Sequence, residues 1–359
     1  MKCIQFNYEK KYIEDFISIP KKLYSKKTNM EDSNTIKTLL LDTHPLSKYF
    51  KLNKFNIYDN YDKIVGRFII TEYPDDKNTC YIGFFECIKD KKTAKFLFEK
   101  ANDFAKVKNY KKIVGPVDAS FWIKYRLKIN KFDLIPYTGE PYNLDYYLKL
   151  FQDNKFKVCE HYTSNIFEIP DKSYSNKKFQ EHYKEFMDKG YEIIKPKMED
   201  YDKCMKEVYY LITDLYSDFP IFKNLSLEDF LEVYKSYKSI INMDMVRMAY
   251  YKGKAVGFYI SIPDYNNRVY HLNVFNILKI LRLRKKPKKY VMLYMGVDRN
   301  HTGLGKAIVQ SIVDELIHNG LPSIGALARD GKISQRYAEE MIESQYEYVL
   351  LERIVKWLV

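Results

Sequence analysis

Two glycines, Gly303 and Gly305, follow a short polar run that begins at Asp298. Glycine has no Cβ atom, so the backbone at these positions can approach a ligand closely. If residues 303–319 form a helix, the unpaired N–H groups of its first turn and the helix dipole attract an anion. The pattern therefore predicts an anion site that a pyrophosphate would fit.

The elements around the glycine pair make it more than a chance match. With 13 glycines in 359 residues, a bare Gly-x-Gly is expected about 0.5 times in the chain. This pair, however, lies between an apolar run at 290–297 and apolar residues at helical spacing in 303–319, and a further strand is expected at 323–328. Strand, helix and strand make a βαβ unit, whose ligands bind beyond the carboxyl end of the first strand. The alternative is that the glycines only form a tight turn.

The rest of the chain divides into two similar halves. In the first half, strands are expected at 55–58, 64–72, 80–88, 111–117 and 156–169, with helices at 93–107 and 144–153. In the second half, strands are expected at 191–196, 245–251, 255–262, 290–297, 323–328 and 346–358, with helices at 199–217, 226–237, 303–319 and 334–344. The charged segment between the halves reads as a surface helix or linker. The interpretation is an α/β protein with domains at 1–172 and 191–359, joined by 173–190.

The second half resembles the GNAT acyltransferases. Their motif A grips the pyrophosphate of an acyl-CoA with Gln/Arg-x-x-Gly-x-Gly/Ala after the fourth strand, and here Asn300, Gly303 and Gly305 take those positions. The first half is similar to the first domain of two-domain GNAT proteins, because Gly115-Pro116, Ser120 and Tyr142-Asn143 recur in their order. It has Lys-Asp-Lys-Lys-Thr where motif A would stand. The resemblance implies tandem domains, each a mostly antiparallel mixed sheet with a splayed central parallel pair flanked by helices, the first being a degenerate copy.

The resemblance also implies a set of site residues. Pantetheine amides would pair with strand 290–297 at Met295 and Val297, and this requires a bulge that Gly296 would accommodate. The family's motif B places Ser334 at its Asn position and Met341 at the position of a tyrosine that protonates the thiolate. Tyr337, one helical turn before Met341, is the substitute for that tyrosine. The implied cofactor-binding residues are Met295, Val297, Asn300, His301, Thr302, Gly303, Leu304, Gly305, Lys306 and Ser334.

No general base is evident in strand 290–297, which lacks Glu, Asp and His. Acyl transfer to an amine needs a deprotonated nucleophile and a donor for the developing oxyanion. The candidates for catalysis are His271, Tyr294 and Tyr337. His271 follows the two strands expected at 245–251 and 255–262, and Tyr294 lies in strand 290–297 itself. Asp264, just after strand 255–262, is a further carboxylate candidate. Each of the base candidates, taken alone, fits a structural role better than a catalytic one.

Composition narrows the function further. The 60 basic and 47 acidic residues give a net charge of +13, but only 10 of the basic residues are Arg, so a nucleic-acid partner is not favoured. Five scattered cysteines with no Cys-x-x-Cys pair argue against disulfides and metal sites, and no metal is expected. With neither a signal peptide nor an apolar run of about 18 residues, we expect a cytoplasmic protein.

Residues 273–290 contain seven basic residues and no acidic one, together with apolar residues at helical spacing. Such a helix suits an anionic membrane or a phosphate-rich ligand. The alternative, a helix that packs its apolar face on the domain and leaves a solvated basic end, is the one we favour. A similar basic insert in related two-domain GNAT proteins also favours it.

The leading hypothesis is a tandem GNAT protein whose second domain binds acetyl-CoA or another acyl-CoA and transfers the acyl group to an amine of a small molecule or peptide. A second hypothesis is a peptidyltransferase resembling the Fem family, which takes aminoacyl-tRNA; the net charge motivates it, and the glycine pair speaks against it. A third is a non-catalytic module that binds CoA or another ligand. The incomplete motifs A and B motivate this third reading.

Overall fold

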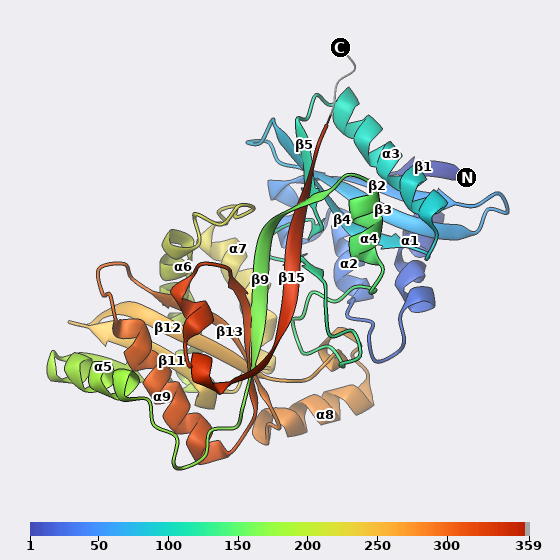
Figure 1. Ribbon diagram of the computed structural model, residues 1–359. Coiled ribbons are helices and arrows are strands. Elements are labelled where there is room, and N and C mark those ends of the chain that lie inside the picture. Colours follow the sequence, from blue (N-terminus) through green and yellow to red (C-terminus); the bar gives the residue numbers. More distant parts are fainter. Residues whose placement is uncertain (356–359) are drawn as a thin grey trace. The chain divides into compact units, whose positions relative to one another are not determined.

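The computed structural model describes residues 1–355, apart from the side chains of Ile333 and Ser334 (Figure 1). The chain forms two compact units, one of residues 1–161 with the segment from Glu347 onward, and one of residues 162–346. This division differs from the boundary near 172 in the sequence interpretation, and it moves the last strand into the first unit. Within residues 1–355, no helix combines the length and the apolar character that crossing a bilayer requires.

The first unit is built on a mixed sheet with the strand order β1-β2-β3-β4-β5-β15. Its strands are β1 (Lys2–Phe6), β2 (Lys51–Tyr58), β3 (Ile64–Glu72), β4 (Thr79–Cys87), β5 (Lys112–Gly115) and residues 347–354 of β15 (Ile342–Ile354), with the short β6 (Val117–Asp118), β7 (Lys124–Tyr125) and β8 (Leu127–Lys128). Its helices are α1 (Lys10–Leu23), α2 (Ser33–Leu40), the 3-10 turn η1 (Pro45–Tyr49), α3 (Lys91–Val107) and α4 (Tyr147–Asp153). Strands β2 to β4 are buried almost throughout, which is typical of a sheet covered on both faces.

The second unit repeats this order as β10-β11-β12-β13-β14-β9. Its strands are β10 (Tyr191–Ile194), β11 (Val246–Tyr251), β12 (Lys254–Pro263), β13 (Tyr290–Val297), β14 (Ser323–Arg329) and residues 162–167 of β9 (Lys157–Phe167). Its helices are α5 (Lys177–Asp188), α6 (Tyr201–Leu215), α7 (Leu227–Tyr234), α8 (Val274–Lys285) and α9 (Leu304–Asn319). Six 3-10 turns complete it: η2 (Met198–Asp200), η3 (Lys235–Ser239), η4 (Met243–Met245), η5 (Arg268–Tyr270), η6 (Ile333–Arg336) and η7 (Glu339–Met341).

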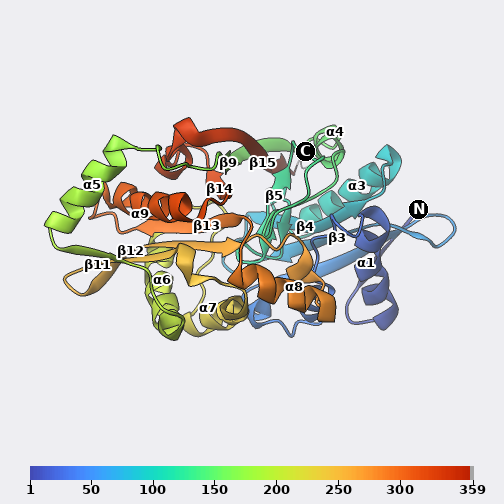
Figure 2. The same cartoon turned by 90° about the horizontal axis from the view of Figure 1, so that it is seen from below.

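Helices cover both faces of the second sheet. Figure 2 shows α5 and α9 on one face of strands β11 to β13, and α6 and α7 on the other. Apolar residues of α9, such as Ile308 and Ile312, pack with Phe179 and Phe186 of α5 and with the sheet residue Tyr259 in one buried cluster. The expected surface helix between the halves is therefore α5, and one side of it is buried against α9.

The two units each complete their sheet with a strand that is distant in sequence. In the first unit β15 pairs antiparallel with β5, with Leu351 opposite Gly115. In the second unit the last residues of β9 pair antiparallel with β14, with Phe167 opposite Ser323. The strand that ends the first half of the sequence thus serves the second sheet, and the last strand of the chain serves the first sheet.

One expected helix is absent. Residues 334–344 form the two 3-10 turns η6 and η7, and Ile342 already begins β15. Between the turns Ala338 has a left-handed backbone (φ 51°), which interrupts a helix. The backbone of this segment is also bonded to the residue that follows β9, since the Met341 carbonyl accepts a hydrogen bond from the amide of Glu168 at 2.8 Å. The sequence analysis expected Tyr337 to lie on a helix, one turn before Met341, and this expectation is wrong because the helix is absent.

Candidate active site

The parallel strands β13 and β14 separate after three residue pairs. Tyr290, Val291 and Met292 pair with Ser323, Ile324 and Gly325, and no later residue of β13 pairs with β14 in the described chain. On its other side β13 stays paired with β12, and the register shifts so that Met292 and Tyr294 face successive residues of β12. Leu293 is the extra residue of a β-bulge, which increases the local twist. The bulge expected in this strand is present, three residues before Gly296.

The freed edge of β13 exposes main-chain groups. The amide of Asp298 donates to the Val256 carbonyl at 2.8 Å, which fixes the side of the strand that bonds to β12. Because alternate residues of a strand bond to opposite sides, the amides of Met295 and Val297 face the gap left by β14. The hydroxyl of Tyr216 donates a long hydrogen bond of 3.4 Å to the Met295 carbonyl. This edge can therefore pair with an extended ligand that carries amides.

The loop after β13 leaves part of its backbone unengaged. Gly303 takes the N-cap position of α9 with φ 97°, a conformation that favours glycine. The amides of Asn300 and Leu304 are used internally, the first by the Asp298 carboxylate at 2.9 Å and the second by the His301 carbonyl at 3.1 Å. Within the described chain, the amides of Thr302, Gly303 and Gly305 donate no hydrogen bond. These three amides lie at the positive end of the α9 dipole.

Two side chains from outside the loop approach these amides. A Cβ atom on Gly305 would overlap the hydroxyl of Tyr337, so only glycine fits beneath that ring. A Cβ atom on Gly303 would lie 3.1 Å from the imidazole of His182 on α5. Tyr337, which the sequence analysis assigned to catalysis, stands at the corner between the loop and α9. His182 was missed, because no pattern in the charged segment 171–189 shows which of its residues α9 will meet.

His182 and Lys306 lie together at this corner. The Nδ1 atom of His182 lies 2.8 Å from the Lys178 carbonyl, which can only accept, so Nδ1 carries a proton. Its Nε2 lies 3.5 Å from the ammonium of Lys306, a residue already assigned to the site. An anion at the free amides would be close to both groups.

The remaining loop residues are engaged in local packing. The Asn300 side chain donates to the Asp298 carboxylate at 3.0 Å, and the Thr302 hydroxyl lies 3.4 Å from the Arg299 carbonyl. His301 holds the loop, since its Nδ1 is 2.7 Å from the Tyr191 hydroxyl and its ring packs edge-on against Tyr191 and Tyr251. The side chain of Ser334 lies outside the described residues.

A narrow apolar pocket opens at the bulge, on the α6 and α7 face of the sheet. It is lined by Tyr201, Met205, Val208, Ile212, Phe230, Tyr234, Tyr237, Ile241, Ile260, Leu293 and Tyr294. The hydroxyls of Tyr234 and Tyr294 are 3.4 Å apart, and burial raises the pKa of Tyr234 well above its usual value. Tyr234 is therefore a neutral hydroxyl there and not a base.

The other base candidates lie away from this lining. His271 follows η5 just before α8, and it is not among the residues that line the pocket. Asp264 is buried and forms an ion pair of 2.7 Å with Lys289. Of the residues assigned to catalysis, Tyr294 alone lies in the pocket wall.

The matching position in the first unit is closed by its own chain. Strands β4 and β5 also separate after three pairs, but a Cβ atom on Gly83 would overlap the Val117 carbonyl that fills the gap. The amide of Phe84 donates to the Asp118 carboxylate at 2.5 Å. At the start of α3 the Asp90 side chain accepts from the amide of Thr93 at 2.8 Å, so an internal carboxylate already stands where an anion would bind. The first unit thus keeps the strand layout without the open edge.

Comparison with known proteins agrees with this layout. No protein-family model and no curated protein sequence matches the chain. Among solved structures, a tandem GNAT protein from the clavulanic acid biosynthesis pathway is 9% identical with a TM-score of 0.53, covering 100% of this chain and 99% of its own. A GCN5-related glucosamine N-acetyltransferase region of a fungal multi-domain beta-N-acetylglucosaminidase is 12% identical with a TM-score of 0.52, covering 98% of this chain and 38% of its own. A conserved protein from Enterococcus faecalis, described as a probable N-acyltransferase, is 9% identical with a TM-score of 0.50, covering 99% and 72%. The chain has a tandem GNAT fold of mixed α/β architecture.

Proposed function

We propose that the second unit binds an acyl-CoA and transfers its acyl group to an amine. The observation that carries the proposal is the continuous run of unused main-chain donors, from the open edge of β13 at Met295 and Val297 to the amides of Thr302, Gly303 and Gly305. A CoA molecule has amides along its pantetheine arm and a pyrophosphate at a fixed distance from them. Few other metabolites would use both a free strand edge and an anion site directly beyond the end of that strand.

The pyrophosphate would lie at the start of α9. Three free amides, the helix dipole and Lys306 all favour negative charge there. These groups replace the Gln or Arg that Asn300 does not supply, because its side chain is turned to Asp298. Tyr337 would contact the bound cofactor beside Gly305, where burial raises the pKa of its hydroxyl and keeps it protonated.

The amine would approach from the pocket at the bulge. Its attack on the thioester carbonyl forms a C–N bond and an oxyanion, for which an amide on the open edge of β13 would be a donor. Collapse of this intermediate breaks the C–S bond, and CoA leaves as a thiolate that takes up the remaining proton of the attacking nitrogen. The pocket lining contains no carboxylate and no histidine, so its own side chains offer no ordinary base. The amine must then lose its proton to solvent before it attacks, and the rate of transfer is expected to rise with pH until the acceptor is neutral.

Calorimetric titration of the full chain with CoA and acetyl-CoA tests the binding step. We expect Lys306→Glu to weaken CoA binding at least tenfold, and Gly303→Glu to abolish it by covering the amides. Lys184→Glu, an exposed change on α5, and Gly331→Glu, a glycine with open space around it, are the matched controls. Wild-type protein that does not bind CoA, or binding that is indifferent to Lys306→Glu and Gly303→Glu, would overturn the proposal.

A second candidate function is a CoA-binding module without catalysis. The absence of a carboxylate from the pocket lining favours this function, as does the position of the Tyr337 hydroxyl, which already fills the space beside Gly305. Release of free thiol from several acyl-CoAs in the presence of a broad amine panel separates the two. CoA binding without thiol release above background would support the module, whereas release that depends on amine and on Tyr294 would support the transferase.

A further inference from the structure

Helix α8 interrupts the hairpin of the second sheet with a segment of unusual composition. It runs from Val274 to Lys285 between β12 and β13, and its N-cap Asn273 accepts from the amide of Asn276 at 3.0 Å. The seven basic residues of this segment are Lys279, Arg282, Arg284, Lys285, Lys286, Lys288 and Lys289, and residues 273–290 include no acidic residue.

The apolar side chains of α8 are exposed, contrary to the packing that the sequence analysis favoured. Phe275 is 77% exposed and Val274 71%, and Ile280 is the only buried residue of the helix. The exposed apolar set is Leu272, Val274, Phe275, Ile277, Leu278 and Leu281. A contiguous set of this size on one short helix is the mark of an interaction surface, because isolated exposed apolar residues do not gather in this way.

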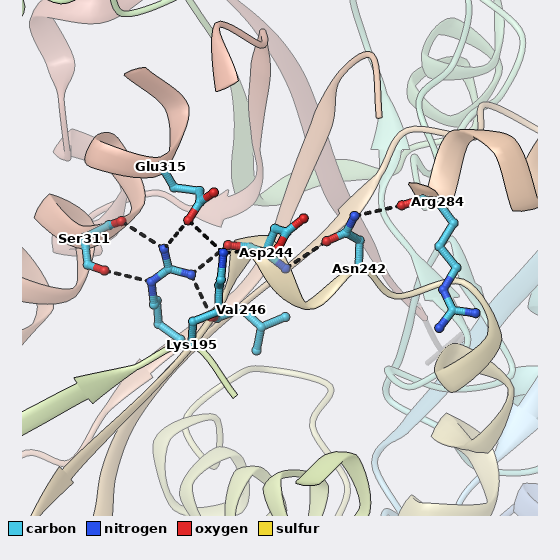
Figure 3. A network of polar contacts seen from close by, with 8 residues as sticks. Lys195, Asn242, Asp244, Val246, Arg284, Ser311 and Glu315 are labelled. Atoms are coloured by element: carbon cyan, nitrogen blue, oxygen red, sulfur yellow. Dashed lines mark hydrogen bonds and ion pairs between the residues drawn. The ribbon is translucent and has the colours of Figure 1, made fainter. Parts of the chain in front are cut away.

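The C-terminal end of α8 is firmly attached to the second unit. Asn242 donates to the Arg284 carbonyl at 2.7 Å, and the Arg284 guanidinium donates to the Ile241 carbonyl at 3.0 Å. Asn242 in turn accepts from the amide of Asp244, whose carbonyl accepts from the guanidinium of Arg247 (Figure 3). Arg247 is bonded to Ser311 and Glu315 of α9. The helix is therefore a fixed projection, and its exposure does not come from a loose segment.

The charge of the segment decides between possible partners. Lys289 is already paired with Asp264 at 2.7 Å, so a second copy of this helix would bring six further cations against the first six, and like charges oppose such a contact. Nucleic acid would use the cations and leave the six apolar side chains in water. An anionic lipid surface satisfies both, since headgroups neutralise Lys and Arg while the acyl boundary takes up Phe and Leu.

We propose that α8 docks the protein on membranes that contain anionic lipid. The apolar set inserts at the headgroup boundary, and the basic residues at the C-terminal end of the helix contact lipid phosphates and carboxylates. This docking is independent of the acyl-transfer proposal, because α8 lies between β12 and the first residue of β13, whereas the unused amides lie in the last residues of β13 and in the loop after it.

Flotation of the full chain with vesicles tests the docking. We expect binding to vesicles of phosphatidylcholine with about 30% phosphatidylglycerol, and little binding to phosphatidylcholine alone. The change Lys285→Glu, Lys286→Glu and Lys288→Glu should lower partitioning at least about a hundredfold, since each juxtamembrane cation contributes about fivefold. The matched control is Lys10→Glu, Lys21→Glu and Lys22→Glu, three exposed lysines on α1.

A second pair of variants separates insertion from simple charge attraction. Phe275→Ser with Leu278→Ser should lower partitioning about tenfold or more without altering the charge, whereas Tyr61→Ser with Val107→Ser, at two exposed apolar sites elsewhere, should not. No binding to anionic vesicles, or binding that Phe275→Ser with Leu278→Ser leaves unchanged, overturns the proposal. A dimer in sedimentation that the same two changes dissociate would assign the face to a second copy instead.

Discussion

Gly305 and Tyr337 should be energetically coupled, because the space that a Cβ atom on Gly305 would take is filled by the Tyr337 hydroxyl. Gly305 is the second residue of α9 and has no positive φ, so alanine there would by itself stabilise the fold by about 0.4–1 kcal/mol. Overlap with the hydroxyl should cost about 1–3 kcal/mol. Gly305→Ala is therefore expected to destabilise the protein by about 1–2 kcal/mol.

Removing the hydroxyl should reverse the sign. The nearest atoms to the new Cβ would then be the methyl carbon of Met295 at 3.1 Å and Cζ of the Tyr337 ring at 3.3 Å, distances that small shifts of these two side chains relieve. Within the described chain the hydroxyl makes no hydrogen bond, so Tyr337→Phe alone should cost little. In the Tyr337→Phe background, Gly305→Ala should raise stability by a few tenths of a kcal/mol up to about 1 kcal/mol. The coupling energy is then about 1.5–3 kcal/mol.

Scanning calorimetry of the four proteins measures this coupling. A unit of this size shifts its Tm by about 2–4 °C per kcal/mol. Gly303→Ala with Tyr337→Phe is the control, because a Cβ on Gly303 meets His182 and not Tyr337, and the two changes should add. If Gly305→Ala lowers the Tm equally with and without the Tyr337 hydroxyl, the tyrosine does not stand over the start of α9, and the description of this corner is wrong.

Three further predictions concern buried charges. Burial raises the pKa of Glu86 to about 8, so the folded state holds the proton of this carboxyl more tightly than the unfolded state does. The free energy of unfolding should therefore fall by about 3 kcal/mol between pH 5 and pH 8. Urea unfolding measured across this pH range should show the fall, and Glu86→Gln should flatten it. Arg247→Met should cost about 1–3 kcal/mol in the same assay, because it removes the partner at 3.0 Å from the Glu315 carboxylate and leaves that group only Lys195 at 3.4 Å. Lys128→Met should cost about 3–5 kcal/mol, and adding Glu140→Gln should recover part of it, since the two side chains form an ion pair with no exposed surface. A flat profile for the wild type, or losses below about 1 kcal/mol for either cation, would contradict the burial that these predictions use.

Local pattern accounted for most of the elements that hold the candidate site. The apolar run at 290–297 and the helical spacing after Gly303 correspond to β13 and α9, and the strands expected at 245–251 and 255–262 correspond to β11 and β12. These elements were predictable because each alternates or repeats its apolar residues over at least six positions, and glycines mark their ends. The first 50 residues, which form β1, α1 and α2, gave no comparable pattern and were not assigned.

Tertiary context decided the segment after β14. Residues 334–344 favour a helix by composition, but Glu168 of the linker after β9 bonds to Met341, and β15 takes over at Ile342. Strand pairing between residues far apart in sequence outweighed a local preference worth only a few tenths of a kcal/mol per residue. The same reasoning explains why β15 completes the first sheet, a pairing that no periodicity reveals.

The amino-acid sequence alone determined the βαβ layout, the two glycines at the start of α9 and the positive charge of residues 273–290, since all three depend on residue type and local spacing. Only the tertiary structure decided which amides after β13 stay unengaged, that His182 and Tyr337 meet beside them, and that α8 leaves its apolar side chains exposed. Those outcomes depend on which distant segments compete for the same space and hydrogen bonds, and that competition is settled when the whole chain packs.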